Sequence, residues 1–178
     1  MWEENPKVLI INTGGTYNKR YNKLNGELEV SGGNEAVDEI LKTVSRGNGI
    51  KSNYKMVAIL SKDSLDITDE DRQVIVETIL FHSDYDRIII IHGTDTMFES
   101  AEFLTKSVGC ADKKIMFVGA MYPYEIDKIE ATFNLAMGLG YLVNMKDTIA
   151  ISMNGYVGNY KNVKKNKING YFEYNLLD

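Results

Sequence analysis

The strongest constraint on the fold is a regular alternation, along the chain, of short β-rich runs with longer segments of helical spacing. The expected strands are the apolar runs Lys7–Asn12, Tyr54–Leu60, Arg87–His92, Lys114–Val118 and Thr148–Met153. The expected helices lie between them, at Glu35–Arg46, Asp69–Ser83, Met97–Val108 and Ile129–Asn144. Continuous aliphatic runs are typical of strands that are buried on both faces. Strands that alternate with helices predict right-handed crossovers and a parallel sheet.

We therefore predict an α/β fold, with a doubly wound, mostly parallel sheet flanked by helices in a three-layer, Rossmann-like arrangement. The length of 178 residues suits a single domain over residues 1–178, and no Pro- or Gly-rich linker divides it. A hydrophobic content of 44% is enough for a core and too high for a disordered chain. Residues 13–34 are expected to form a long irregular loop, and residues 169–174 an antiparallel edge strand.

The composition excludes several classes of protein. One cysteine, Cys110, cannot form an internal disulfide, and with only His82 and His92 no Cys/His zinc site can be assembled, so we expect no metal. No apolar run approaches the roughly 18 residues of a membrane helix, and the acidic start is unlike a secretory signal, so we expect a cytoplasmic protein without a membrane partner. The net charge of −5 argues against nucleic acid as the main partner.

Hydroxyl, carboxylate and glycine residues follow the expected strands at the points where the strands end. These segments are Thr13-Gly14-Gly15-Thr16, Ser61–Asp66, Gly93-Thr94-Asp95-Thr96 and Gly119-Ala120-Met121. In an open parallel sheet, ligands bind just beyond the carboxyl ends of the strands. The sequence therefore predicts a site for a small polar molecule at this edge of the sheet.

The residue types suggest how such a site could work. Gly14 and Gly15 allow the backbone N–H groups after Thr13 to approach a ligand, which favours an anion or a developing oxyanion. A threonine hydroxyl needs a base, and in a chain this poor in histidine a lysine oriented by Asp95 is the natural candidate, with Thr94 relaying a proton. The alternatives are a ligand-free turn and a phosphate-binding turn, although no dinucleotide or P-loop pattern follows a strand. His92 is expected to be structural.

The motifs Thr13–Thr16 and His92–Thr96, each at a strand end, closely resemble the two signature motifs of the bacterial-type L-asparaginases. Three weaker matches accompany them. Asp63–Asp66 resembles the serine-containing substrate loop of the family, Gly119–Met121 its Gly-Ala-Met turn, and Val163–Lys165 the segment of its catalytic lysine. The resemblance covers nearly the whole chain, and it gives Lys165 a role beyond that of a solvated lysine-rich loop.

This resemblance implies a cofactor-free amidohydrolase that converts L-asparagine, or a similar amide, to L-aspartate and ammonia through a threonine acyl-enzyme. The implied catalytic residues are the nucleophile Thr13, the proton-relay triad Thr94, Asp95 and Lys165, and a lid tyrosine, with Tyr21 preferred to Tyr17. The implied substrate-binding residues are Ser64 for the α-carboxylate, Asp95 for the α-amino group, the backbone of Gly119 and Ala120 for the amide, and Gly14, Asp63 and Gly93 beside them.

Two departures from the family shape these expectations. Family members usually carry a second, C-terminal α/β domain, whereas residues 1–178 are expected to form the N-terminal type of domain alone. Tyr122-Pro123 stands where the family has Arg-Pro, so the preference among asparagine, glutamine and other amides stays open. By analogy with the family we expect a homo-oligomer, a dimer or a tetramer. Two other functions remain open: a non-catalytic amino-acid-binding sensor module, and a nucleoside- or nucleotide-cleaving enzyme on a similar sheet.

Overall fold

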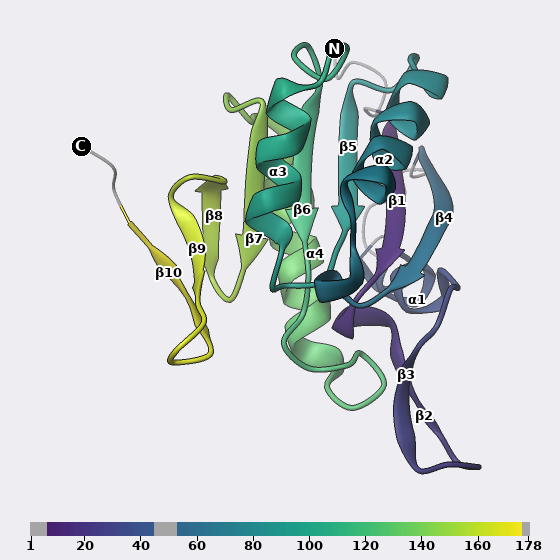
Figure 1. Cartoon of the computed structure of the whole chain (residues 1–178). Coiled ribbons are helices and arrows are strands. Elements are labelled where there is room, and N and C mark those ends of the chain that lie inside the picture. Colours follow the sequence, from purple (N-terminus) through teal and green to yellow (C-terminus); the bar gives the residue numbers. More distant parts are fainter. Residues whose placement is uncertain (1–6, 45–52, 176–178) are drawn as a thin grey trace.

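A largely parallel sheet forms the centre of the molecule, as the alternation of strands and helices predicts (Figure 1). The computed structural model describes residues 7–44 and 53–175. The central sheet has six strands in the order β4-β1-β5-β6-β7-β8. The first five strands of this order pair in parallel, and β8 pairs antiparallel with β7. The bounds are Val8–Gly14 for β1, Tyr54–Lys62 for β4, Arg87–Ile91 for β5, Lys114–Val118 for β6, Ile149–Met153 for β7 and Tyr156–Asn159 for β8.

Four helices cover the two faces of this sheet in the described part of the chain (Figure 1). The helices are α1 (Glu35–Val44) and α4 (Lys128–Val143) on one face, and α2 (Asp69–Phe81) and α3 (Met97–Lys106) on the other. The predicted three-layer α/β arrangement is confirmed. The predicted end of the first helix, at Arg46, lies outside the described residues.

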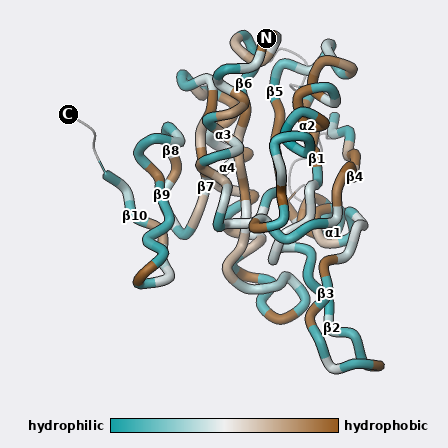
Figure 2. Tube along the Cα trace, in the orientation of Figure 1, coloured by the Kyte–Doolittle hydropathy of each residue, from teal (hydrophilic) through white to brown (hydrophobic). Residues whose placement is uncertain are grey.

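Successive side chains of each strand enter the two cores in turn. On β1, Val8 and Ile10 contact the α1/α4 core, whereas Leu9 and Ile11 contact the α2/α3 core. Residues 88–91 of β5 are isoleucines that are all fully buried. Each such side chain contributes roughly 1.5–3 kcal/mol through the removal of apolar surface from water. Figure 2 shows hydrophobic residues concentrated along the central strands.

The expectation of an irregular loop over residues 13–34 was wrong. A 3₁₀ turn, η1 (Thr16–Asn18), is followed by an antiparallel hairpin of β2 (Lys19–Asn22) and β3 (Glu27–Val30), which extends beyond the carboxyl ends of the strands (Figure 1). Each strand has only four residues and is largely exposed. One face carries Tyr21, Leu28 and Val30 and the other carries only polar and charged residues, but this alternation is too short to identify a strand from sequence. The turn between β2 and β3 does carry a typical turn residue, Asn22, whose side-chain oxygen accepts the N–H of Leu24.

The expected antiparallel strand near residues 169–174 is present, but it does not belong to the central sheet. The antiparallel edge strand of the central sheet is β8, which follows a tight turn at Asn154-Gly155. Residues 171–174 form β10 (Tyr171–Tyr174), which pairs with β9 (Val163–Asn166) in a separate two-stranded ribbon. Within the described ranges, no helix is long and apolar enough to cross a membrane.

Candidate active site

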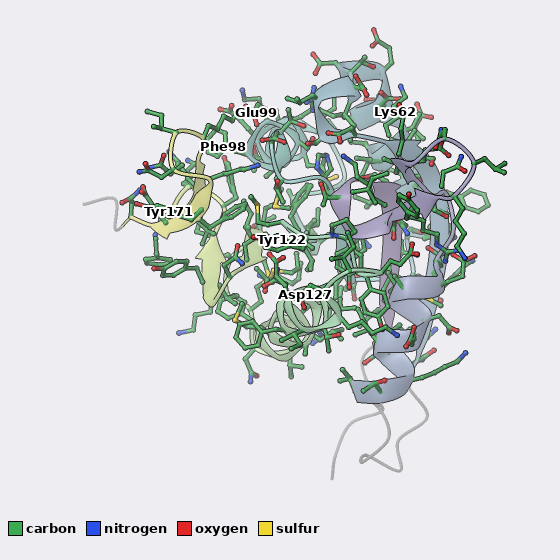
Figure 3. All side chains as sticks on the ribbon, turned by 90° about the horizontal axis from the view of Figure 1, so that it is seen from below. Lys62, Phe98, Glu99, Tyr122, Asp127 and Tyr171 are labelled. Atoms are coloured by element: carbon green, nitrogen blue, oxygen red, sulfur yellow. The ribbon has the colours of Figure 1, made fainter. Side chains whose placement is uncertain are left out.

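The predicted site segments meet at the carboxyl edge of the sheet, onto which Figure 3 looks. The turn after β1, the loop after β5 and the 3₁₀ turn η3 (Ser64–Asp66) after β4 are in direct contact there. Gly15 has φ 75° and ψ −175°, a backbone conformation that is essentially restricted to glycine. A Cβ on Gly15 would lie 2.5 Å from the backbone of Gly93, and a Cβ on Gly93 would lie 2.6 Å from Cβ of Ser64. The glycines of both motifs thus allow three turns to stack without a gap.

Lys165 reaches the loop after β5 from the separate ribbon. Its Nζ donates to Oγ1 of Thr94 at 2.9 Å and to Oδ1 of Asp95 at 2.7 Å. The Lys165 side chain is 13% exposed and that of Asp95 is 32% exposed, so the ion pair is largely shielded from water. The structure therefore brings together the three residues of the predicted relay, although Lys165 lies 71 residues after Thr94 and 70 after Asp95 in the sequence.

The pleat of the ribbon explains why Lys165, rather than Lys164, faces the site. Lys165 lies directly opposite Phe172 on β10, and Val163 shares its face two residues earlier. Val163 and Phe172 are buried in the α2/α3 core, which anchors this face of the ribbon to the body of the protein. Lys164 starts from the opposite face of β9, and its Nζ lies 4.9 Å from the ring centroid of Phe98, at the rim of the cavity beside the site and without a hydrogen bond to Thr94 or Asp95 among the described contacts. Alternation along β9 thus delivers one lysine to the site.

A cavity of about 180 Å³ lies against the ion pair of Lys165 and Asp95. Its lining is mainly apolar and includes Phe98, Ile151 and Phe172. Interactions between charges are stronger beside apolar surfaces than in water, because the effective dielectric constant is lower there. The ammonium and carboxylate groups are therefore held more firmly than a pair on open surface.

Ser64 and Asp63 lie on the neighbouring turn, and their hydrogen bonds differ in kind. Ser64 is buried, and its Oγ accepts the N–H of Asp95 at 3.1 Å, which leaves the proton of the hydroxyl to donate elsewhere. Asp63 pairs with Lys19 of β2 at 2.8 Å, and the hydrogen bond from Lys19 is the main reason that the pKa of the Asp63 carboxyl is lowered. Ser64 is thus placed to bind a ligand, whereas Asp63 fastens the hairpin.

Thr13 is fully buried beneath these turns. Its Oγ1 donates to the carbonyl oxygen of Ile91 at 2.8 Å. The next residue, Gly14, donates its N–H to the side chain of Asn12 at 3.0 Å and lies against the backbone of Lys62. A carbonyl oxygen cannot act as a base, so a nucleophilic Thr13 must exchange this partner for the relay.

The two candidate lid tyrosines occupy different surroundings. Tyr17 is fully buried, donates to the carbonyl of Ala131 at 3.3 Å, and has a pKa raised well above its usual value by burial. Tyr21 lies on β2 with 53% of its surface exposed. Among the contacts of the described residues, neither hydroxyl bonds to Thr13 or to the Lys165 relay. Since Tyr17 is fixed in the core, Tyr21 is the one free to move, and its role stays a prediction.

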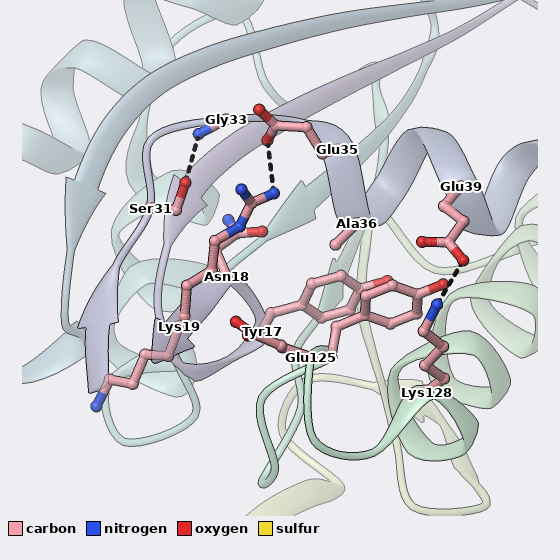
Figure 4. A pocket seen from close by; sticks show the side chains of 12 residues that line it. Tyr17, Asn18, Lys19, Ser31, Gly33, Glu35, Ala36, Glu39, Glu125 and Lys128 are labelled. Atoms are coloured by element: carbon pink, nitrogen blue, oxygen red, sulfur yellow. Dashed lines mark hydrogen bonds and ion pairs between the residues drawn. The ribbon is translucent and has the colours of Figure 1, made fainter. Parts of the chain in front are cut away.

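A second cavity, of about 260 Å³, lies between the hairpin and the starts of α1 and α4 (Figure 4). Charged groups span it in pairs: Arg20 lies 3.4 Å from Glu35, and Lys128 lies 2.6 Å from Glu39. The N–H of Tyr21 adds a 3.2 Å hydrogen bond to Glu125. Exposed pairs of this kind are screened by water and contribute little. Beside this cavity the hairpin is thus joined to the body by weak contacts of Arg20 and Tyr21, whereas the pair of Lys128 and Glu39 joins α4 to α1.

Two residues of α4 that the sequence did not single out, Asn134 and Glu130, support the turn after β6. Asn134 of α4 donates to the carbonyl of Gly119 at 3.0 Å, and its oxygen accepts the N–H of Asn154 at 2.9 Å. Glu130, one helical turn earlier, accepts the N–H of Met121 at 2.9 Å. Ala120 is thereby held in a buried position. The sequence signal for this role was the polar Asn134 in an apolar stretch of the helix, because a buried polar side chain needs hydrogen-bond partners.

The histidines and acids present no metal cluster. Within residues 7–44 and 53–175, no three His, Cys, Asp or Glu side chains converge as metal ligands. The chemistry of the edge therefore has to be argued from hydroxyl, ammonium, carboxylate and backbone groups.

Comparison with known proteins confirms the resemblance drawn from the two motifs. The family model described as the asparaginase N-terminal domain matches residues 7–172. L-asparaginase 2 of Escherichia coli is 30% identical over 156 residues, which are 81% of this chain and 44% of that protein. The probable periplasmic L-asparaginase of Haemophilus influenzae is 28% identical over 165 residues, which are 90% of this chain and 46% of that protein. The chain thus spans about half the length of the curated relatives it matches.

Solved structures show the same likeness in three dimensions. The probable cytoplasmic L-asparaginase from Campylobacter jejuni has a TM-score of 0.72 and 25% identity, covering 90% of this chain and 50% of that one. L-asparaginase I from Vibrio cholerae has a TM-score of 0.77 and 21% identity, covering 96% of this chain and 50% of that one, which shows the shared fold.

The close contact between turns predicts a strong effect of a single methyl group. We expect Gly15→Ala to destabilise the protein by at least about 2 kcal/mol, because the new Cβ meets backbone atoms that cannot move aside. Gly26→Ala is the control, since Gly26 has a similar φ of 78° and its Cβ would meet only the Tyr21 hydroxyl, at 3.8 Å. Its cost should be about 1 kcal/mol, the backbone strain alone. Urea unfolding measures both, and equal losses would contradict the stacking argument.

Proposed function

This chain belongs to the asparaginase family, and we propose that it hydrolyses the side-chain amide of L-asparagine to L-aspartate and ammonia. One observation carries the proposal: Nζ of Lys165 lies 2.9 Å from Oγ1 of Thr94 and 2.7 Å from Oδ1 of Asp95, on the loop that packs against Gly15, just after the end of β1 that carries Thr13. A lysine shielded from water, a hydroxyl and a carboxylate in contact can move a proton in a reaction without metal or cofactor. The similar proteins of Haemophilus influenzae and Escherichia coli are a probable L-asparaginase and L-asparaginase 2.

Substrate binding follows from the groups that remain available. The free proton of the Ser64 hydroxyl would donate to the α-carboxylate, and the Asp95 carboxylate would accept from the α-ammonium group. These two groups are adjacent, because Oγ of Ser64 accepts the N–H of Asp95 at 3.1 Å. The side-chain amide would then extend towards Thr13 and the backbone around Gly14, Gly93 and Ala120. Hydrogen bonds to charged groups contribute about 1.5–3 kcal/mol each, which suits recognition of a zwitterion.

The chemical step we propose is a two-stage acyl transfer. The Thr13 oxygen attacks the amide carbon while its proton passes through Thr94 to Lys165, which gives one of its own protons to the Asp95 carboxylate. The N–H of Gly14 donates to Asn12 and that of Gly15 to the Lys62 carbonyl, so an oxyanion beside Thr13 would take over one of these donors. The C–N bond then breaks, the nitrogen takes the proton and ammonia leaves, so Thr13 holds an aspartyl ester. Water, deprotonated by the same relay, hydrolyses this ester and restores the hydroxyl. Tyr21 would assist from the hairpin.

Assembly and location form part of the proposal. We propose that residues 1–178 act as one domain and that the protein works as a homo-oligomer, a dimer or a tetramer. We propose a cytoplasmic location, as for the Campylobacter jejuni protein, which is described as probable cytoplasmic. The Haemophilus influenzae relative is described as periplasmic.

The direct test is ammonia release from L-asparagine, L-glutamine and the D-isomers. We expect release from L-asparagine, and a loss of at least about 10³-fold in kcat for Thr13→Val, which keeps the shape of the side chain and removes the nucleophile. Thr13→Ser keeps the hydroxyl and should retain measurable turnover. A Thr13→Val protein as active as the wild type would contradict the mechanism. Saturable stabilisation by asparagine without any ammonia would instead favour the sensor module.

The ribbon supplies a matched pair of lysines for a second test. Lys165→Met should lower kcat by at least about 10²-fold, because it removes the base while keeping the length of the side chain. Lys164→Met changes the neighbouring residue on the opposite face and should leave kcat within a few-fold of the wild type. Ammonia assays on both variants, with circular dichroism to confirm folding, distinguish them. Similar losses in the two variants would argue that positive charge near the site matters, rather than the relay.

Ser64 offers a test of substrate binding. Ser64→Ala should raise KM for L-asparagine by about 10–100-fold, the loss of one hydrogen bond to a charged group, with a smaller effect on kcat. Ser107→Ala is the control, because its hydroxyl bonds the carbonyl of Phe103 at the end of α3 and has no part in the site. Steady-state kinetics on asparagine measure both. An unchanged KM in Ser64→Ala would remove Ser64 from the binding set.

A further inference from the structure

A chain of buried polar groups connects α2 to the loop that carries Thr94 and Asp95. Nε of Arg72 lies 3.0 Å from Oγ of Ser100 on α3, and this oxygen lies 2.9 Å from Nε2 of His92. Nδ1 of His92 lies 2.8 Å from the carbonyl oxygen of Gly93. His92 and Ser100 are fully buried, and Arg72 is 9% exposed. The proposed reaction gives these groups no chemical step.

The chemistry of the donors fixes the direction of each hydrogen bond. A guanidinium group can only donate, so Oγ of Ser100 accepts the Nε–H of Arg72. The Ser100 proton is then directed at Nε2 of His92, which must be unprotonated to accept it. A neutral imidazole of this kind carries its proton on Nδ1 and donates to the Gly93 carbonyl. The other neutral tautomer would set a bare Nδ1 against that carbonyl oxygen, two acceptors at 2.8 Å.

A charged ring is disfavoured at the same position. Burial lowers the pKa of His92 to about 4, with the positive charge of Arg72 adding to the effect and the bond to Gly93 opposing it. Protonation of Nε2 would also take from Ser100 the acceptor of its hydroxyl proton. His92 therefore stays neutral around neutral pH and holds one tautomer.

Gly93 is the residue on which this bond acts. Its backbone packs against Gly15 on one side and Ser64 on the other, so rotation of its peptide unit would disturb all three turns. The next residues along the chain, Thr94 and Asp95, make the contacts with Lys165. At the far end, Nη1 of Arg72 donates to Asp69 in the first turn of α2 at 2.7 Å. The polar chain thus ties the loop to a helix that lies outside the site.

We propose that His92 is a positioning residue for this site: its Nδ1–H holds the Gly93 carbonyl, and so keeps Thr94 and Asp95 in line with Lys165. The inference rests on the proposed function, because the loop matters to catalysis only if Thr94, Asp95 and Lys165 form the relay. His92 itself touches no substrate in this scheme. A displacement of about 1 Å in a catalytic group can cost about 10²-fold in rate, so the effect should appear in kcat.

Two amide substitutions separate the two ends of the imidazole ring. In His92→Asn the side-chain N–H₂ takes the place of Nδ1 and can still donate to Gly93. In His92→Gln the amide reaches the place of Nε2, satisfies Ser100 and leaves Gly93 without its donor. We expect His92→Asn to keep most of the kcat, and His92→Gln to lose at least about 10-fold in kcat with a smaller change in KM.

The second histidine of the chain provides the control. His82 ends α2, where its ring lies 2.9 Å from the carbonyl of Thr78, and His82→Gln should leave kcat and KM unchanged. Urea unfolding of each variant separates loss of stability from loss of rate in the folded protein. Wild-type kinetics in both His92→Gln and His92→Asn would overturn the inference while leaving the proposed function intact. Equal losses in the two variants would also overturn it, because the Gly93 donor would then not be the cause.

A measurement without substrate keeps the inference testable even if no ammonia is released. In the His82→Gln protein His92 is the remaining histidine, so its ring nitrogens can be assigned by ¹⁵N NMR without ambiguity. We expect a protonated Nδ1, an unprotonated Nε2 and no titration around neutral pH. A wild type that releases no ammonia would refute the proposed function alone. A ring protonated on Nε2 would overturn the positioning role whatever the activity.

Discussion

The contact between the backbones of Gly15 and Gly93 is the constraint on which the site depends. Parallel strands bring their carboxyl ends to one edge, but neighbouring strands alone do not bring the loops that follow them into contact. With a Cβ at either position the turns would have to separate, since the nearest atoms are backbone or the buried Ser64. The turn of Thr13, the loop of Thr94 and Asp95, and the turn of Ser64 therefore exist as one surface only because two residues lack side chains.

Lys165 reaches this surface by a different route. It lies on a two-stranded ribbon that is separate from the central sheet, so the strand pairing of the central sheet does not fix its position. Burial of Val163 and Phe172 does so instead, since both share its face and enter the core beneath α3. Moving an ammonium group out of water is costly, and the Asp95 carboxylate and Thr94 hydroxyl offset that cost. Burial of the apolar residues thus positions the ribbon, and the ion pair with Asp95 stabilises the lysine that the ribbon brings to the site.

The sequence predicted the parts of this structure that carry a strong local signal. Aliphatic runs such as Arg87–His92 identified the buried strands, and the position of Thr13 and Thr94 after two of them placed the site. The hairpin of β2 and β3 was missed because each strand has only four residues and is largely exposed, so its form depends on pairing and on ion pairs such as Lys19 with Asp63. Contacts of Lys165 across 70 residues leave no local pattern, and only the resemblance pointed to them.

The hydrogen bonds already made at the edge limit how a ligand can be oriented. Asp63 is paired with Lys19, and Oδ1 of Asp95 is paired with Lys165. In the described contacts, the hydroxyl protons of Ser64 and Thr94 and the Oδ2 atom of Asp95 have no partner, and these groups are adjacent. A molecule that presents a carboxylate and an ammonium on one carbon satisfies donors and acceptor alike, whereas a phosphate satisfies the donors and is repelled by the carboxylate. The set of unused groups therefore favours an α-amino acid over a nucleotide at this edge.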